Sequence, residues 1–190
     1  NLTINTGGTT GTIQFGGLVG DTVGLGAISI TGNLDLDANI VDAASLAVSG
    51  TSNLGANVTT TGTQTYTGAA IISANISLTG GSQLTFSSTV DSSDTDGTTD
   101  SRTLTTTFTE TEFDGAVGGT YALGALDING NLDLDAAITS AASIDVSGTS
   151  NLGANVTTTG TQTYTGAVTL STDVTLTTTN GNVYFSSTLN

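Results

Sequence analysis

The sequence predicts an all-β fold, a right-handed parallel β-helix (β-solenoid) with coils of about 18–22 residues. Three observations support this prediction: apolar residues alternate with polar ones, the alternation recurs at a fixed spacing, and the recurring lines keep their residue types position by position. Alternation is the period-2 pattern of a strand with one buried face. One such line cannot bury its apolar face alone, whereas stacked lines can. Tandem antiparallel β-sandwich repeats are the alternative, because Gly- and Thr-rich all-β domains of this size are common.

The elements follow from the lines. Lines begin at Ile28, Leu46 and Gln64, and another begins at Leu84 after two extra residues. Leu34, Leu36, Ala38 and Ile40 are expected to point inward, because side chains alternate between the two faces of a strand. The columns shared by successive lines are Ile30, Val48, Tyr66 and Phe86; Gly32, Gly50 and Gly68; Leu36, Leu54 and Ile72; Ala38, Ala56 and Ala74; and Ile40, Val58 and Ile76. The Gly columns predict corners.

A longer repeat contains these lines. The string GTSNLGANVTTTGTQTYTGA occupies residues 50–69 and again 148–167, which gives a repeat of about 98 residues. We therefore interpret 1–190 as one continuous solenoid, with a first repeat at 1–98, a second at 99–190, and an acidic loop inserted at 91–102. We expect five coils in each repeat and about ten in the chain, which is a rod of roughly 45–50 Å. The second copy repeats the pattern with Ile128, Val146 and Tyr164.

Composition excludes many functions. The chain of 190 residues has no Cys, His or Pro, one basic residue (Arg102) and 16 acidic ones, for a net charge of -15. One Arg cannot neutralise the phosphates of a nucleic acid. Zinc sites of the usual kind, disulfides and the commonest general bases are excluded with Cys, His and Lys. No apolar run approaches the roughly 20 residues of a membrane span. Composition thus favours a structural or binding protein, with no catalytic residues, no nucleic acid and no membrane insertion.

Several phrases resemble a known family. TTTGTQTYTGAVTL (157–170), LTINTGGTTGTIQFGG (2–17) and GAVGGTYALGAL (115–126) resemble the β-strand repeat regions of giant bacterial surface and secreted proteins related to filamentous haemagglutinin. The resemblance implies a right-handed parallel β-helix shaft, export by a Gram-negative bacterium, and roles in adhesion, biofilm matrix or extracellular filaments. The family's N-terminal secretion domain has no counterpart in these residues.

Function and partners are predicted on this basis. We expect a structural segment of an extracellular or cell-surface filament or adhesin shaft, which self-associates end to end or belongs to a longer periodic array of the same chain. A calcium-dependent module that binds glycans or neighbouring cells is the alternative. A β-helix enzyme acting on polysaccharides is a third reading, which the absence of Lys and His disfavours.

The acidic loop is the first candidate metal site. It carries Asp91, Asp94, Asp96 and Asp100. Asp94-Thr95-Asp96-Gly97 is similar to the start of a calcium-binding loop, in which alternate carboxylates and a Gly turn wrap a Ca²⁺ ion. The downstream Glu of an EF-hand is missing. The alternative is a solvated loop that bulges from one coil.

A pair of Asp residues recurs in both repeats. Asp35 and Asp37 return as Asp133 and Asp135, and alternation places each pair on the outer face. Such a pair suits the acid and base of glycoside hydrolysis, a bridging divalent cation, or a solvated face. The duplication favours architecture over a single active site.

Asn residues form a further column. Asn39, Asn57 and Asn75, with Asn155 in the second copy, predict either a ladder of stacked side-chain amides or independent turn residues.

Overall fold

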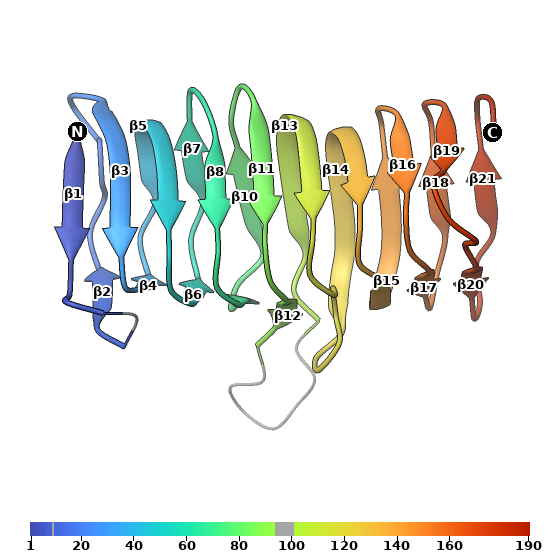
Figure 1. Cartoon of the computed structure of the whole chain (residues 1–190), viewed down its shortest axis with the longest axis horizontal. Coiled ribbons are helices and arrows are strands. Elements are labelled where there is room, and N and C mark those ends of the chain that lie inside the picture. Colours follow the sequence, from blue (N-terminus) through green and yellow to red (C-terminus); the bar gives the residue numbers. More distant parts are fainter. Residues whose placement is uncertain (9, 94–100) are drawn as a thin grey trace.

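The chain forms an elongated stack of coils, with its two termini at opposite ends (Figure 1). This computed structural model describes residues 1–8, 10–93 and 101–190. All strand pairs among the described residues are parallel. In Figure 1 the front strands run downward and the back strands upward while the chain advances from left to right, which is a right-handed coil. The predicted β-solenoid is confirmed, and the antiparallel sandwich is wrong.

Each coil has three faces, called front, bottom and back as they appear in Figure 1. The front carries β1 (Leu2–Asn5), β3 (Leu25–Thr31), β8 (Gln64–Tyr66), β11 (Gln83–Phe86), β16 (Ser150–Leu152) and β19 (Val168–Leu170). The bottom carries β2 (Thr12–Phe15), β4 (Asn33–Leu36), β6 (Ser52–Leu54), β9 (Ala70–Ile72), β12 (Val90–Ser92), β17 (Val156–Thr158) and β20 (Leu176–Thr178). The back carries β7 (Val58–Thr60), β10 (Ile76–Thr79), β18 (Gln162–Tyr164) and β21 (Val183–Phe185). Four longer strands turn a corner: β5 (Ile40–Val48), β13 (Leu104–Phe113), β14 (Leu123–Leu134) and β15 (Ile138–Val146).

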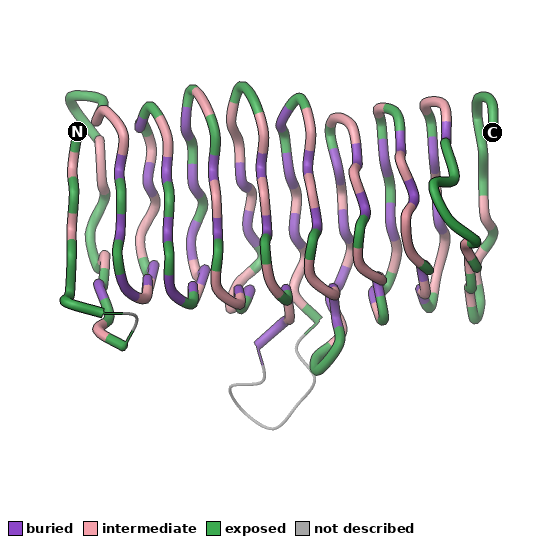
Figure 2. The backbone as a smooth tube through the Cα atoms, in the orientation of Figure 1, coloured by how far each residue is buried: buried purple, intermediate pink, exposed green. Residues whose placement is uncertain are grey.

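Cross-coil pairing aligns like residues in columns. The inward column of the back face joins nine residues by eight successive pairings: Val19, Ile40, Val58, Leu78, Thr106, Ile128, Val146, Tyr164 and Phe185. Buried and exposed residues alternate along the strands, as Figure 2 shows. The core is therefore one continuous apolar cluster along the rod, as the alternation predicts.

Aromatic rings stack within the core. Tyr66, Phe86 and Phe113 follow one another on the front face, with ring centroids 5.1 and 5.5 Å apart. Burial raises the pKa of the Tyr66 hydroxyl, which stays protonated and donates a hydrogen bond to Gln64 Oε1. The buried Gln64 side chain in turn donates through Nε2 to the Val58 and Thr79 carbonyl oxygens. Gln64 thus points inward because its polar atoms have partners.

The predicted Gly corners are present. Gly32, Gly50 and Gly68 lie above one another, and a Cβ atom on Gly68 would collide with the carbonyl oxygen of Gly50. Gly32 also has a φ of 142°, in the region that L residues avoid. Close approach of successive coils therefore requires Gly at this corner.

The two extra residues before Leu84 lie one corner earlier than the columns predict. Leu54 pairs with Ile72, as the regular spacing of the lines requires, but Val58 pairs with Leu78. Leu78 rather than Ile76 therefore follows Val58 in the inward column of the back face, which corrects the predicted Ile40, Val58 and Ile76 column.

The repeat does not fill a whole number of coils, which corrects the expectation of five. Ile30 lies in the front column with Tyr66, whereas its equivalent Ile128 lies in the back column. Following the pairings from Ile30 to Ile128 gives four and two-thirds turns. The turn from Val90 to Val117 uses more of the chain than a regular coil, because its connections at 93–103 and 114–122 add length without covering a face. The second repeat is therefore rotated by one face relative to the first.

The strands alone build the described part of the chain. None of the described residues forms a helix, so this part offers no helix long and apolar enough to cross a membrane.

Candidate functional site

The structure separates the predicted acidic residues. Asp91 lies in β12 on the bottom face, while Asp94, Asp96 and Asp100 lie outside the described residues. Asp35 lies in β4 on the bottom face, and Asp37 follows that strand. Asp133 and Asp135 take the equivalent places on the front face, at and after the end of β14. The two Asp pairs thus lie on different faces, and they do not form one site.

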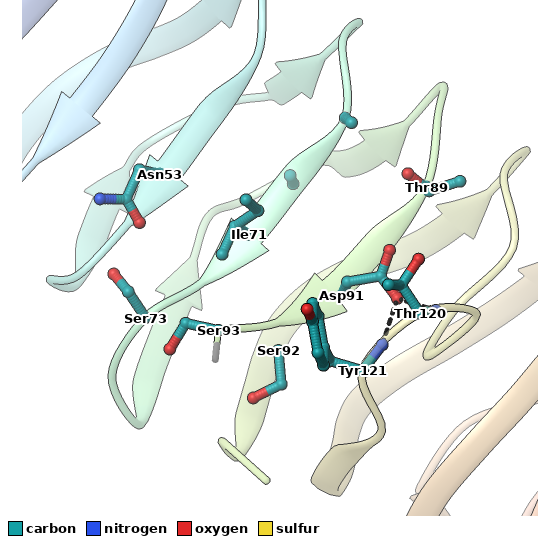
Figure 3. Close-up of a pocket in the computed structure, with 11 residues that line it drawn as sticks. Asn53, Ile71, Ser73, Thr89, Asp91, Ser92, Ser93, Thr120 and Tyr121 are labelled. Carbon is teal, nitrogen blue, oxygen red and sulfur yellow. Dashed lines mark hydrogen bonds between the residues drawn. The ribbon is translucent and has the colours of Figure 1, made fainter. Parts of the chain in front are cut away.

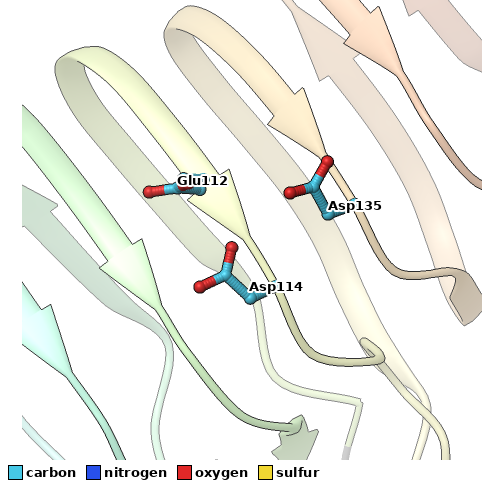
Figure 4. Close-up of side chains that lie close together, drawn as sticks. All are labelled: Glu112, Asp114 and Asp135. Atoms are coloured by element: carbon cyan, nitrogen blue, oxygen red, sulfur yellow. The ribbon is translucent and has the colours of Figure 1, made fainter. Parts of the chain in front are cut away.

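The second Asp pair belongs to a larger group that the sequence argument missed. Glu112, Asp114 and Asp135 have carboxylate oxygens that all lie within 4.8 Å of one another, and we call these three residues the acidic cluster. Figure 4 shows the cluster on two neighbouring coils. Asp133 lies beside it, because Asp133 pairs directly with Glu112. The signal that could have found the cluster is the repeated acidic-x-acidic spacing of Glu112-Phe113-Asp114 and Asp133-Leu134-Asp135, once the register places one above the other.

The electrostatics of the cluster centre on Glu112. Its pKa is raised above the ordinary value, first by partial burial and further by the negative charges of Asp114, Asp133 and Asp135. A hydrogen bond of 3.0 Å from Thr85 Oγ1 to Glu112 Oε2 acts in the opposite direction. Gln83 Nε2 donates to the same oxygen at 2.9 Å and to Glu110 Oε1 at 3.2 Å. Neutral donors therefore offset part of the repulsion between the carboxylates.

The first repeat provides an internal comparison. Gln14 and Gly16 occupy the positions that Glu112 and Asp114 hold in the second repeat. Gln14 Nε2 donates a hydrogen bond of 2.7 Å to Asp37 Oδ2, so an amide lies where the second repeat has a carboxylate. Both repeats keep the other contact of the Asp pair, from Asn53 to Asp35 (2.8 Å) and from Asn151 to Asp133 (2.9 Å). The cluster is thus a property of the second repeat alone.

The chemistry of the cluster is that of oxygen ligands. Three carboxylates at this spacing suit a hard cation such as Ca²⁺, or a shared proton. Acid–base hydrolysis at the Asp pairs has less support, because Asn53 and Asn151 each occupy an oxygen of the first Asp in the pair. Of the predicted metal residues described here, only Asp135 is in the cluster.

A groove on the bottom face was also missed. It has a volume of about 580 Å³ and lies between the outer surface of the sheet and the segment at Thr120 and Tyr121. Figure 3 shows that Asp91 fastens this segment, because Asp91 Oδ1 accepts hydrogen bonds from the backbone N–H groups of Thr120 (2.7 Å) and Tyr121 (3.2 Å). Ile71 and Tyr121 supply exposed apolar surface, with exposed fractions of 45% and 37%. Ile71 is the signal in the sequence, since it breaks the alternation at an outward position.

The groove suits an uncharged or cationic ligand. Its lining offers apolar side chains, hydroxyl groups and the Asp91 carboxylate, and no Lys or Arg is among the residues that line it. An anionic ligand would meet unfavourable charge there.

The Asn column has a specific hydrogen-bond pattern. Asn39 Oδ1 accepts from the backbone N–H of Asn57 (2.9 Å), and Asn57 Oδ1 accepts from that of Ser77 (2.8 Å). Asn75 and Asn155 accept in the same way from Thr103 and Thr175. The bonds therefore run from a backbone N–H to a side-chain oxygen of the preceding coil, where the sequence argument expected amide-to-amide contacts or independent turns. These residues fasten corners between coils.

Comparison of the chain with protein-family models, curated proteins and solved structures finds no match.

Proposed function

We propose that this chain is a structural segment of an extracellular filament or adhesin shaft of a Gram-negative bacterium. The observation that supports the proposal most directly is the unbroken stack, in which eight successive pairings join Val19 to Phe185. Backbone ladders and a continuous core resist bending, so the fold suits a rigid projection. Its surface of Thr, Ser, Asn and Asp suits exposure to water.

The rod is tested by imaging. Chains extended by one, two and three further repeats should appear in electron micrographs as rods that lengthen by about 22 Å per repeat, since coils stack about 4.8 Å apart. Compact particles, or a length independent of repeat number, would contradict the proposal.

The location is tested separately. Antibodies against this chain should label the outside of intact producing cells or the material between them. Labelling only after lysis would contradict an extracellular role.

A calcium-dependent binding module is the competing function, and the acidic cluster is the feature that bears on it. Under this alternative a chelator lowers both the melting temperature and the attachment of the protein to cells, and Ca²⁺ restores both. Under a purely structural role neither quantity changes.

A further inference from the structure

The two identical segments, 50–69 and 148–167, are the uncharged part of a strongly charged chain. All 16 acidic residues and the single Arg lie outside them. We call these ranges the neutral segments. Between molecules of net charge -15, electrostatic repulsion is weakest where the facing surfaces carry no charge.

The neutral segments fold alike but face different directions. In the first, β6, β7 and β8 lie on the bottom, back and front faces, and in the second, β16, β17 and β18 lie on the front, bottom and back faces (Figure 1). Each strand is thus one face away from its copy. The two copies are separated by four and two-thirds turns, or about 22 Å along the rod.

Each neutral segment contributes to an outward column of Thr. Thr59 pairs with Thr79, and Thr79 with Thr107, on the back face. Thr157 pairs with Thr177 on the bottom face. On the front, the corresponding outward column contains Glu112 and Asp133. Columns of identical short side chains at the coil spacing can interdigitate between paired sheets, and here only the Thr columns can do so without bringing carboxylates together.

We propose that the two Thr columns are lateral contact surfaces for further copies of this chain, and that one rod engages two neighbours on different sides. The inference rests on the proposed rod and specifies how rods associate. Because the two surfaces face different directions, a third molecule can join a pair of rods without competing for the same face. The result is a branching bundle, and a single flat surface cannot contact both columns at once.

The test adds one negative charge to each surface. Thr59→Asp, Thr157→Asp and the double variant are compared with wild type by sedimentation velocity over a concentration series. Wild type should assemble beyond dimers. Each single variant should stop at dimers, with a dissociation constant at its charged surface raised more than tenfold, and the double variant should remain monomeric. Added salt should strengthen wild-type assembly, because it screens the net charge.

Matched controls separate this effect from others. Ser29→Asp adds the same charge at an exposed front position and should assemble as wild type does. Thr59→Asn and Thr157→Asn keep the surfaces neutral and should also assemble. Circular dichroism verifies that each variant is folded.

Two results would overturn the proposal: wild type that stays monomeric up to about 1 mM, or Thr59→Asp and Thr157→Asp variants that assemble as Ser29→Asp does. Micrographs distinguish the levels of failure. Separate rods contradict only the lateral contacts, whereas the absence of rods contradicts the proposed function itself. Association that survives in the double variant and lengthens particles without widening them is end-to-end association, and it also contradicts the lateral surfaces.

Discussion

At the residue scale, Glu112 and Gln14 occupy equivalent positions in the two repeats and have opposite electrostatic effects. Gln14 donates a hydrogen bond to Asp37, whereas Glu112 adds a negative charge beside Asp114, Asp133 and Asp135. One carboxylate in place of an amide therefore converts a satisfied Asp pair into a repulsive cluster.

This difference predicts a pH-dependent stability. The pKa of Glu112 is raised on folding, so the folded state favours its protonated form, and stability is lost as pH rises from the ordinary Glu pKa through the folded value. Glu112→Gln should raise the melting temperature at pH 7 by about 1–3 °C. The gain should vanish near pH 3, where wild-type Glu112 is protonated in both states. Scanning calorimetry over pH measures this.

Gln14→Glu is the converse control. It places a carboxylate where the amide served Asp37, so it should lower the melting temperature at pH 7. An equal or higher melting temperature in Gln14→Glu would contradict the electrostatic account.

Core residues show a second effect at this scale. Phe86 is fully buried between Tyr66 and Phe113, whereas Phe185 at the end of the stack is 38% exposed and stacks on Tyr164 alone. Phe86→Ala should lower the unfolding free energy by about 3–5 kcal/mol. Phe185→Ala should cost less than half of that, since less surface leaves water. Denaturant titration measures both, and equal costs would contradict the continuous core.

At the scale of single elements, corners and connections depend on hydrogen bonds from side chains. Asn39, Asn57, Asn75 and Asn155 join one coil to the next through backbone N–H groups. Asp91 does the same for the connection that covers the groove. A carboxylate therefore has a structural partner in this connection, which the sequence argument considered only as a metal site.

Loss of Asp91 should loosen this connection. Asp91→Ala removes the acceptor for the backbone N–H groups of Thr120 and Tyr121, so their hydrogen exchange should accelerate by more than tenfold, with little change in the core strands. Asp145→Ala, at an exposed position in β15, is the control and should leave both amides unchanged. Unaltered exchange in Asp91→Ala would show that other contacts hold the connection.

At the scale of the whole molecule, the important quantity is the number of coils per repeat. A repeat of four and two-thirds turns rotates each successive copy by one face. In a longer array three repeats would return to the starting face after about 14 coils, or about 67 Å. Residues of the repeat surface would then follow a spiral around the rod.

Distances between spin labels test the rotation, and the chain has no native cysteine to interfere. Thr59 and Thr165 share one outward column, five pairings apart. Labels at Thr59→Cys and Thr165→Cys should be about 24 Å apart along the axis. Labels at the equivalent pair Thr59→Cys and Thr157→Cys should give the longer distance, because they lie on two faces. The reverse order would mean that the repeat fills whole coils.

The sequence by itself determined the class of fold. Alternation fixed which residues point inward, the regular spacing of the lines fixed the coil, and Gly32, Gly50 and Gly68 fixed a corner. These features follow from interactions within one coil and with its nearest neighbours, which repeat along the chain and therefore leave a periodic signal.

Only the tertiary structure decided how far the chain turns between the repeats. That number depends on how much of the chain the connections at 93–103 and 114–122 take up without covering a face, and such connections carry no periodic signal. The acidic cluster and the groove depend on it in turn. Glu112 meets Asp133 and Asp135, and Asp91 reaches Tyr121, because those irregular connections set the register between coils.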